Sequence, residues 1–570
     1  MTTARTTSIA QRLRGVSAYA PPSRPAHVDL ILDLNEGPTP DATLLESIDP
    51  RALNRYPDAR PLEDTIAQRF GIDASRVLVT NGGDDAIDRI CRAFLEPGRT
   101  LLQHTPTFEM IERSARLAGA DVRSINWIDG AFPLDEFTRA LDDENVAMLA
   151  LVTPNNPTGR VVPSDALVAL ADDAADRGIA ALIDLAYIEF ADHDPTPDLL
   201  TRDNVIIVRT FSKALGLAGL RVGYAIAPKH ITDALRAAGG PFPVSAPSLA
   251  IASASLTRDD SNAHRVRHER TQFTHLLRAL HAQPLDSQSN FVTARFDHAE
   301  TLHARLLALG ISVRALAHKP GCEGLLRVTM PGNERDFDRL THAVRTSLAP
   351  EALLFDLDGV LADVSNSYRA AIIETAATFG VTITRDDIAR AKSAGNANND
   401  WGLTQRLLAS TLPTPPTLEE VTARFQRLYL GDANTPGLEA TESLITDTAC
   451  IERLAARYPL AIVTGRPRED ATRFLERFEI ARHFNAIICM EDGPSKPEPD
   501  VVRLALDRLG VQHAWMIGDT VDDAVAARRA RVLPIGVLAP GDGERAHNAL
   551  ISAGVAAVLQ RADQLEGLLP

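Results

Sequence analysis

Short apolar runs rich in β-branched residues alternate with longer helical patterns along most of the chain, and this alternation constrains the fold more than any other feature. VAMLALV (146–152), AALIDLA (180–186) and NVIIVRT (204–210) have the length and composition of buried strands. Strands that alternate with helices predict βα units and mostly parallel sheets. We therefore expect an α/β protein.

The alternation restarts at ALLFDLDGV (352–360), so a second sheet is expected there. A charged amphipathic stretch ends at Ser347, just before this run, which predicts one domain over residues 1–348 and another over 351–570. Between the second domain's first two strands, the apolar residues follow helical spacing. This pattern predicts an inserted helical cap over about residues 362–450.

The bulk composition excludes several classes of protein. A chain of 570 residues with 45% hydrophobic residues can build more than one core. Its formal net charge of -16 argues against binding to nucleic acid or to an anionic membrane. The 4 cysteines are too far apart for a disulfide framework or a paired metal site, and no apolar run is long enough to span a membrane. The N-terminus lacks the apolar core of a signal peptide, so we expect a cytoplasmic protein that acts on small molecules.

Three features of the first domain match the needs of a pyridoxal phosphate enzyme, which are a Schiff-base lysine, a carboxylate for the ring nitrogen and donors for a phosphate. Lys213 lies in RTFSKALGLAGLRVGY, and Asp184 ends an apolar strand. VTNGGDDAIDRI (79–90) predicts a strand, a glycine turn and a helix N-terminus, which is an anion site. Taken singly, a solvated lysine and a plain βα turn would be the simpler interpretations. Their combination favours the cofactor site.

These residues resemble those of the fold-type I aminotransferases and, within them, the histidinol-phosphate aminotransferase family. The resemblance extends from LDLNEGP (32–38) and NRYPD (54–58) to SNFVTARF (289–296) and GLLRVTM (324–330). It implies the pyridoxal-phosphate transferase fold, pyridoxal 5'-phosphate as cofactor and a homodimer.

The resemblance also implies a role for each matching residue. Lys213 would form the Schiff base, Asp184 would pair with the pyridine nitrogen, and Asn156 and Tyr187 would bond the ring oxygen. Phe108 would stack on the ring, where the family usually has a tyrosine. The cofactor phosphate would be held by Gly83, Asp84, Thr210, Ser212 and Arg221, and by Tyr56 of the neighbouring subunit. Arg327 would bind the carboxylate of the amino donor, and Arg314 and Tyr19 would bind the phosphate of the other substrate.

Two departures from the family pattern leave the amino acceptor open. Leu185 stands in Asp184-Leu185-Ala186-Tyr187 where the family often has glutamate, and LNEGP (34–38) replaces the commoner Asn-Glu-Asn-Pro. Paralogues of this family act on other phosphorylated, aromatic or specialised substrates.

The second domain carries the residues that a nucleophilic aspartate needs for attack on phosphorus, which are a metal site, a cation and hydroxyl donors. Asp356 and Asp358 follow a strand and are expected on one side of it, because side chains alternate with period 2. Thr464 follows the strand LAIVTG, and Lys496 lies in GPSKPEPD. Asp519 ends the strand of AWMIGDTVDDA, with Asp523 four residues on. Any one of these alone would be an ordinary strand-end or loop residue.

Their order is similar to that of the haloacid-dehalogenase superfamily, over about residues 350–565. This resemblance implies Asp356 as the nucleophile and Asp358 as general acid and then base. Thr464 and Lys496 would bind the phosphoryl group, and Asp356, Asp358, Asp519 and Asp523 are the candidate Mg²⁺ ligands. A general acid favours hydrolysis of phosphate monoesters over dehalogenation. In the cap, Lys392, Asn396 and Trp401 are candidate specificity residues, with a structural loop as the alternative.

The fusion suggests that one chain could carry imidazole-acetol phosphate through histidinol phosphate to histidinol. Two alternatives stay open: both chemistries could act on another phosphorylated amino alcohol, or one domain could be catalytically silent and serve dimerisation or ligand sensing.

Overall fold

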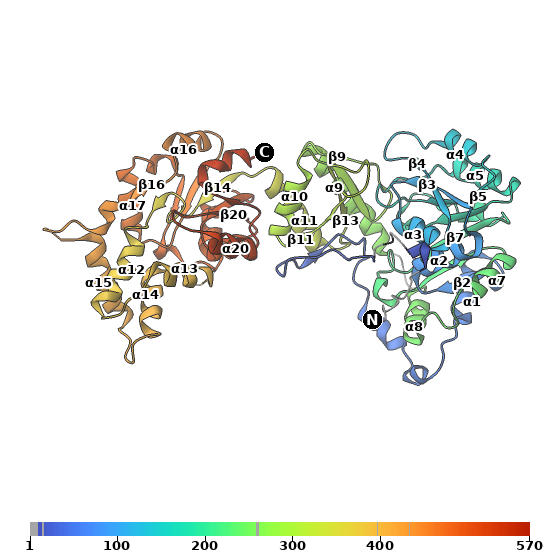
Figure 1. The fold of residues 1–570 in the computed structure, drawn as a ribbon, viewed down its shortest axis with the longest axis horizontal. Helices are drawn as coiled ribbons and strands as arrows, with labels where there is room; N and C mark the ends of the chain where they lie inside the picture. Colours follow the sequence, from blue (N-terminus) through green and yellow to red (C-terminus); the bar gives the residue numbers. More distant parts are fainter. Residues whose placement is uncertain (1–9, 14–15, 17, 258–260, 396, 433) are drawn as a thin grey trace, which may run out of the picture. The chain divides into compact units, whose positions relative to one another are not determined.

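The computed structural model describes residues 10–13, 16, 18–257, 261–395, 397–432 and 434–570 (Figure 1). The chain divides into two compact units. The first holds residues 32–299 and 313–338 with an N-terminal stretch that ends at Pro22. The second holds residues 23–31, 300–312 and 339–570. Because the second unit takes in segments that precede residue 348, the predicted boundary at residues 348–351 stays a prediction.

A seven-stranded sheet forms the centre of the first unit, in the order β2-β8-β7-β6-β5-β3-β4. Strand β8 runs antiparallel to both of its neighbours, and all other pairs are parallel. The strands are β2 (Val77–Thr80), β3 (Thr100–Thr105), β4 (Asp121–Asn126), β5 (Val146–Val152), β6 (Ala180–Asp184), β7 (Val205–Thr210) and β8 (Gly223–Ile226). The predicted α/β class is confirmed.

Alternate residues of the central strands face two separate hydrophobic cores, as the period of 2 requires. In β5, Leu149 and Leu151 belong to the core on one face, whereas Met148, Ala150 and Val152 belong to the core on the other. Helices therefore cover both faces, and the strands read as nearly continuous apolar runs. These helices are α1 (Arg60–Phe70), α2 (Gly82–Phe94), α3 (Glu109–Ala118), α4 (Leu134–Ala140), α5 (Ser164–Asp176), α6 (Thr196–Leu199), α7 (Lys229–Ala238) and α8 (Ala246–Ser255).

A smaller antiparallel sheet, in the order β12-β13-β10-β9, completes the first unit. Its strands are β9 (Gln283–Pro284), β10 (Phe291–Arg295), β12 (Arg314–Ala315) and β13 (Leu325–Thr329). Helix α9 (Ser261–Ala279) packs against strands β9 and β10 of this smaller sheet. The strand β13 carries Arg327 and β12 begins with Arg314, so this sheet supplies the predicted substrate-binding arginines.

A six-stranded parallel sheet, in the order β18-β17-β14-β19-β20-β21, forms the centre of the second unit. Its strands are β14 (Ala352–Phe355), β17 (Leu460–Val463), β18 (Ala486–Ile488), β19 (Ala514–Gly518), β20 (Leu533–Val537) and β21 (Val558–Leu559). The helices around it are α16 (Thr448–Ala455), α17 (Arg468–Arg477), α18 (Asp500–Leu509), α19 (Val521–Arg529) and α20 (Glu544–Ala553). The predicted second sheet is confirmed.

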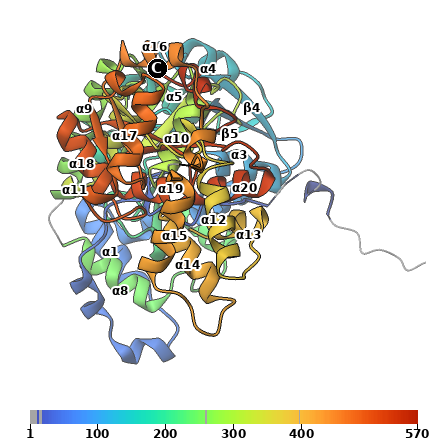
Figure 2. The same cartoon turned by 90° about the vertical axis from the view of Figure 1, so that its left-hand side faces the viewer.

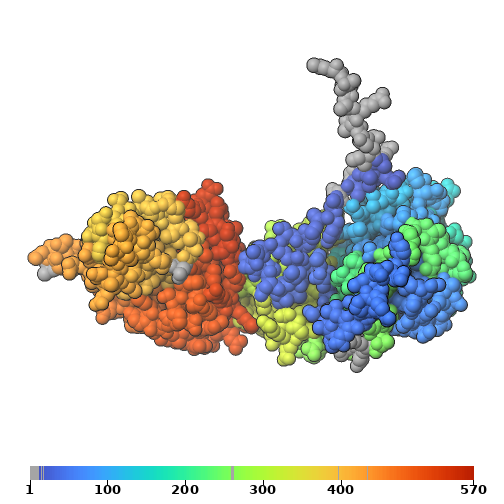
Figure 3. Space-filling view, turned by 90° about the horizontal axis from the view of Figure 1, so that it is seen from below, coloured from blue at the N-terminus to red at the C-terminus, as the bar shows by residue number. Residues whose placement is uncertain are grey.

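The predicted helical insertion lies between β15 (Ala362–Asp363) and β16 (Ser443–Leu444), which pair with each other. We call the segment between these strands, residues 364–442, the cap. Its helices are α12 (Tyr368–Thr378), α13 (Arg385–Ser393), α14 (Asp400–Ala409) and α15 (Leu418–Leu430). They lie together in Figure 2, and Figure 3 shows their outer surface in yellow and orange.

The second unit also contains helix α10 (Ala299–Ala308) from Glu300 onward, the short parallel pair β1 (Leu30–Ile31) and β11 (Ile311–Ser312), and helix α11 (Glu334–Leu348) from Arg339 onward. The carbonyl of Thr346 would normally accept a hydrogen bond from residue 350, which is a proline without an N–H group. The indole Nε1 of Trp515 in β19 donates to this carbonyl instead, at 2.6 Å. Arg305 of α10 lies over the same indole ring, 4.5 Å from its centre.

Candidate active sites

A cavity of about 530 Å³ lies in the first unit, within the size range of small-molecule sites. Every residue that the sequence predicts for the aminotransferase site lines it, except Tyr56. These residues are Tyr19, Gly83, Asp84, Phe108, Asn156, Asp184, Tyr187, Thr210, Ser212, Lys213, Arg221, Arg314 and Arg327. Parallel strands end at the same edge of a sheet, and Asp184 and Thr210 are the last residues of the neighbouring strands β6 and β7.

Lys213 lies in the loop after β7 and projects into this cavity. Its Nζ donates a hydrogen bond to the carbonyl of Leu34 at 3.3 Å and lies 5.5 Å from the centre of the Tyr187 ring. The Tyr187 hydroxyl accepts a hydrogen bond from Nδ2 of Asn35 at 3.0 Å. Asn35 was not predicted from the sequence as a site residue, although it lies in the LNEGP motif.

Asp184 is almost fully buried, and burial raises the pKa of its carboxyl to about 7. A hydrogen bond from the backbone N–H of Ala186 and the charge of nearby Lys213 lower this pKa, but by less than burial raises it. A buried carboxylate without a close cation is costly. A protonated pyridine nitrogen would supply that cation, so the residues present fit pyridoxal phosphate.

The opposite end of the cavity fits a phosphate. Helix α2 begins at Gly82, directly after β2, and its N-terminal N–H groups favour an anion. Arg221 is paired with Asp84 at 2.9 Å, and Ser212 donates its backbone N–H to the Thr210 hydroxyl at 3.1 Å. A Cβ atom at Gly82, whose φ is +79°, would lie 2.8 Å from the Arg221 guanidinium. The glycine therefore leaves room for this arginine at the helix N-terminus.

Arg327 is buried at the substrate end of the cavity. Its Nη2 donates to the carbonyl of Asp33 at 2.8 Å, its Nη1 donates to Oδ1 of Asn156, and its Nε has no partner among the described residues. Burial lowers the pKa of Arg327 to about 10, so the group remains cationic at neutral pH. The cavity wall also contains Arg314 and Lys319, the second of which pairs with Glu109 at 3.1 Å. Lys319 was missed from the sequence.

The structure clarifies the two departures from the family pattern. Leu185 is fully buried in the hydrophobic core and does not line the cavity. Gly37 packs directly against the loop of Lys213, because a Cβ atom at this position would lie 1.9 Å from the Lys213 carbonyl oxygen.

Tyr56 lies outside the cavity. Its side chain is 83% exposed and stacks on the ring of Phe242, with 4.7 Å between the ring centres. The prediction that it reaches a neighbouring subunit stays a prediction.

The second site lies at the carboxyl edge of the six-stranded sheet. Asp356 follows β14, Asp519 follows β19, and Asp523 lies in the first turn of α19. Their carboxylates lie within 4.8 Å of one another, and all three residues are buried. Three of the four predicted metal ligands are thus brought together.

Lys496 lies among these carboxylates. Its Nζ is 2.5 Å from Asp523 and 3.1 Å from Asp356, and it donates to the carbonyl of Val463 at 3.0 Å. Burial raises the pKa of Asp356 to about 7, although the charge of Lys496 lowers it. Burial also raises the pKa of Asp519. One ammonium cannot neutralise three buried carboxylates. The oxygen ligands and the excess negative charge fit a Mg²⁺ ion.

Asp358 is not part of this cluster. Strand β14 ends at Phe355, so strand alternation does not determine where Asp358 points, and its Oδ1 pairs with Nε of Arg466 at 2.5 Å. Its carboxylate therefore lies outside the cluster, and the role of Asp358 as a metal ligand stays a prediction. Thr464 lies beyond the end of β17, as predicted, and its hydroxyl accepts the backbone N–H of Arg466 at 3.2 Å. Arg466, in the motif TGRP, was missed from the sequence.

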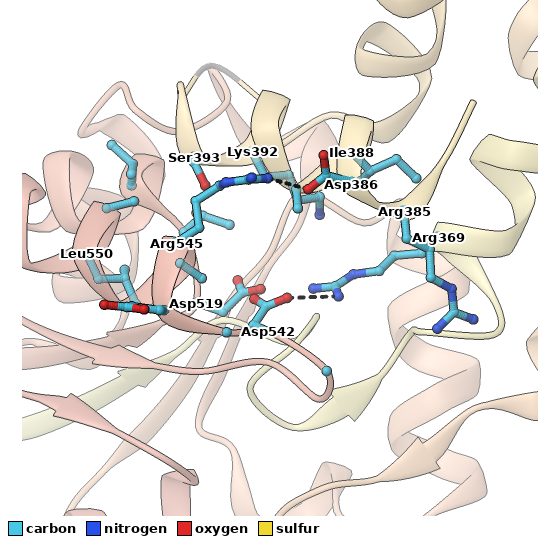
Figure 4. A pocket seen from close by; sticks show the side chains of 18 residues that line it. Arg369, Arg385, Asp386, Ile388, Lys392, Ser393, Asp519, Asp542, Arg545 and Leu550 are labelled. Carbon is cyan, nitrogen blue, oxygen red and sulfur yellow. Dashed lines mark hydrogen bonds and ion pairs between the residues drawn. The ribbon is translucent and has the colours of Figure 1, made fainter. Parts of the chain in front are cut away.

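A cavity of about 400 Å³ opens between the cap and the sheet, and its lining includes Asp519 (Figure 4). Ion pairs join the two sides: Arg369 of α12 lies 3.1 Å from Asp542, and Arg545 of α20 lies 2.5 Å from Asp386 of α13. The cavity can hold a substrate next to the carboxylate cluster.

The three candidate specificity residues of the cap differ in their placement. Lys392 lines the cavity of about 400 Å³ between the cap and the sheet. Trp401 lies in the first turn of α14 and does not line this cavity. Asn396 lies outside the described residues.

The fold and the two sites define a fused enzyme, with an aminotransferase part followed by a phosphate-handling hydrolase part. Residues 31–344 match the family model of class I and II aminotransferases, and residues 350–531 match that of haloacid dehalogenase-like hydrolases. The chain belongs to the class I and II aminotransferase family, with a haloacid dehalogenase-like hydrolase domain.

Two curated proteins are similar to parts of the chain, and the first of them is an aminotransferase. A histidinol-phosphate aminotransferase of Caldanaerobacter subterraneus is 32% identical over 303 residues, which are 52% of this chain and 85% of the relative. A protein of Phytophthora nicotianae named imidazoleglycerol-phosphate dehydratase is 51% identical over 197 residues, which are 33% of this chain. The match spans only 44% of that relative.

A solved structure, the histidinol-phosphate aminotransferase of Sinorhizobium meliloti in complex with pyridoxal-5'-phosphate, has the same fold as the first part of the chain. It superimposes with a TM-score of 0.55 at 22% identity, over 60% of this chain and 99% of that one. Among the described residues, no helix is both long enough and apolar enough to cross a membrane.

Proposed function

We propose that the first site transfers the amino group of glutamate to imidazole-acetol phosphate in a reaction that depends on pyridoxal phosphate. The second site would hydrolyse a phosphate monoester with the aid of Mg²⁺, and histidinol phosphate is its first candidate substrate. The observation that carries the proposal is the cavity that joins Lys213 and Asp184 to the cationic wall of Arg314 and Arg327. A cofactor site beside two arginines suits substrates with a carboxylate or a phosphate group.

In the first site, pyridoxal phosphate would supply an electron sink for the carbanion formed at the substrate carbon. The chain's own residues would hold the reactants and move the proton. Asp184 would keep the ring nitrogen protonated, and the phosphate would lie at the N-terminus of α2 with Arg221. The amine of Lys213 would move the proton at the reacting carbon, while Arg327 binds the carboxylate of glutamate.

In the second site, Mg²⁺ held by Asp356, Asp519 and Asp523 would neutralise the charge of the phosphoryl group. Lys496 and Thr464 would hold that group in place. The carboxylate of Asp356 would attack phosphorus, and Asp358 would give a proton to the leaving alcohol.

The names of the two relatives support a shared substrate class, because both names contain an imidazole-bearing phosphate ester. The product of the proposed transamination, histidinol phosphate, is itself a phosphate monoester, so it could be the substrate of the second site. Another phosphorylated amino alcohol is the second candidate. The departure from the family motif at Gly37, which packs on the Lys213 loop, leaves this second candidate open.

A homodimer is part of the proposal. Tyr56 and Phe242 form an exposed aromatic stack, and Leu45 and Leu53 are exposed by 62% and 65%. Exposed apolar side chains that cluster on one face are typical of a protein–protein interface.

The test is an assay of the full chain with pyridoxal phosphate and Mg²⁺, in which histidinol phosphate and 2-oxoglutarate are supplied and glutamate and inorganic phosphate are recorded separately. The variant Lys213→Ala should lose only glutamate formation, and Asp356→Asn should lose only phosphate release. A variant that leaves both activities intact would identify its domain as catalytically silent. Activity only with other phosphorylated amino alcohols would favour the second candidate.

A further inference from the structure

A second, much smaller cavity lies beside Asp358, under the cap. Its volume is about 10 Å³, which is roughly the space of one water-sized group. It is lined by core residues and by residues of the cap, among them Trp401. The cap lies directly on the core here, because a Cβ atom at Gly465 would lie 2.5 Å from the carbonyl oxygen of Asn398. This space fits one oxygen atom of a substrate and excludes a whole alcohol.

Arg466 forms one wall of this cavity, and its side chain is fully buried. Its Nε donates to Oδ1 of Asp358, and its Nη1 donates to Glu442 of the cap at 3.1 Å. Burial lowers the pKa of Arg466, but the two carboxylates outweigh burial and raise it well above its usual value. The guanidinium is therefore a fixed, permanent cation beside Asp358.

Two buried N–H donors of the cavity lining have no acceptor within the part of the chain that the structure describes. One is Nη2 of Arg466 and the other is the indole Nε1 of Trp401. Buried donors are nearly always paired in native proteins. Two free donors and one carboxyl group around a space for one atom match an oxygen that gains negative charge.

We propose that this cavity holds the leaving oxygen of an alkyl phosphate, and that Arg466 and Trp401 stabilise the charge that develops on this oxygen. The inference rests on the proposed phosphatase function and specifies its substrate class. An alkyl alcohol is a poor leaving group, so its oxygen carries substantial charge in the transition state. An aryl oxygen such as that of p-nitrophenol disperses its charge into the ring and gains little from these donors.

The step balances with the groups present. The carboxylate of Asp356 forms a bond to phosphorus, and the bond between phosphorus and the leaving oxygen breaks with its electron pair on that oxygen. Oδ1 of Asp358 accepts a hydrogen bond from Arg466, so Oδ2 is the oxygen that remains to pass the proton of the proposed general acid to the leaving oxygen. Arg466 and Trp401 neither gain nor lose a proton.

The experiment compares hydrolysis of p-nitrophenyl phosphate, phenyl phosphate, benzyl phosphate and ethyl phosphate by the full chain with Mg²⁺. In Arg466→Gln, we expect kcat/KM to fall by about 100-fold for ethyl and benzyl phosphate and by less than about 3-fold for p-nitrophenyl phosphate. The dependence of rate on leaving-group pKa therefore becomes steeper. Trp401→Phe keeps the ring and removes one donor, so we expect the same trend at about tenfold.

Arg482→Gln is the matched control, because this arginine is 68% exposed and pairs with Glu452 at the surface. It should leave all four rates unchanged. An equal loss for all four substrates in both cavity variants, or no loss, would overturn the inference, as would a wild-type chain that hydrolyses only aryl phosphates. If Arg466→Gln does not fold, Trp401→Phe decides alone. A wild-type chain that releases no phosphate from any ester would instead refute the proposed phosphatase function.

Discussion

The ammonium of Lys496 lies 3.1 Å from a carboxylate oxygen of Asp356, and both side chains are almost fully buried. The same ammonium lies 2.5 Å from Asp523. One cation therefore offsets two buried acids in the metal-free protein.

Replacing this lysine with methionine, Lys496→Met, keeps an unbranched side chain that is one atom shorter and removes its charge. We expect phosphate release to fall by at least about 100-fold, because the phosphoryl group loses a cation. Without Mg²⁺ the free energy of unfolding should fall by about 3–5 kcal/mol, since buried carboxylates lose their partner. Enzyme assays and chemical denaturation with and without Mg²⁺ measure both effects.

Lys229→Met is the control for this variant, because Lys229 pairs with Asp233 at the surface. Surface pairs contribute about 0–1 kcal/mol. Similar losses in the two variants would contradict the role of Lys496, and so would a loss of transamination in Lys496→Met.

Asp184 should make the cofactor-free protein less stable as pH rises. Burial raises the pKa of this carboxyl from 3.8 to about 7, so the folded state binds a proton that the unfolded state has already released. This contribution is fully present below pH 4 and is lost as pH rises to about 7, by at most about 4 kcal/mol.

Thermal unfolding of the wild type and of Asp184→Asn, each between pH 5 and 8, isolates this contribution as the difference between the two proteins. Bound pyridoxal phosphate should reduce the difference, because a protonated ring nitrogen would pair with the carboxylate. Identical pH profiles of the two cofactor-free proteins would contradict the prediction.

Leu53 should contribute to the proposed dimer interface. Its side chain is 65% exposed, so Leu53→Asp has little effect on a monomer but places a charge in an apolar contact between subunits. We expect the variant to shift from dimer toward monomer, measured by light scattering after size-exclusion chromatography. Loss of bound pyridoxal phosphate should accompany this shift if Tyr56 reaches the partner's site. Leu418→Asp, at another exposed leucine, is the control, and an unchanged dimer in Leu53→Asp would argue against this interface.

Trp515→Phe should destabilise the second unit. The substitution keeps a smaller aromatic ring but leaves the buried carbonyl of Thr346 without its indole donor, and the lost hydrogen bond costs about 1–3 kcal/mol. Trp127→Phe is the matched control, because Trp127 is equally buried and its Nε1 has no acceptor among the described residues. Denaturation curves of the two variants should differ by this amount, and equal curves would show that the Thr346 hydrogen bond contributes nothing.

Strand ends explain why so much of both sites could be predicted from the sequence. In each large sheet, the carboxyl ends of neighbouring parallel strands meet at one edge. Asp184 and Thr210 lie at these ends in the first sheet, and Asp356 and Asp519 follow them in the second. The alternation of strand and helix patterns therefore predicted both the sheets and the neighbourhood of these residues.

The residues that escaped prediction depend on contacts between distant segments. Arg466 acquires its second carboxylate partner only when the cap brings Glu442 to it. Asp358 was expected to follow strand alternation, but its strand ends earlier and Arg466 sets its direction. Lys319 lies in the loop after β12 and lines the first cavity together with residues of distant segments. No local pattern encodes such pairings.

The hydrogen bond that the Trp515 indole donates to the carbonyl of Thr346 has a consequence for how such a chain can evolve. The obvious point for genetic recombination is the short link before β14, since strand and helix patterns change there. A break at that point would separate Trp515 from both Thr346 and Arg305. A gene that encodes the hydrolase without α10 and α11 would therefore need new mutations around Trp515 before its product was stable. This requirement favours inheritance of the two enzymes as one gene.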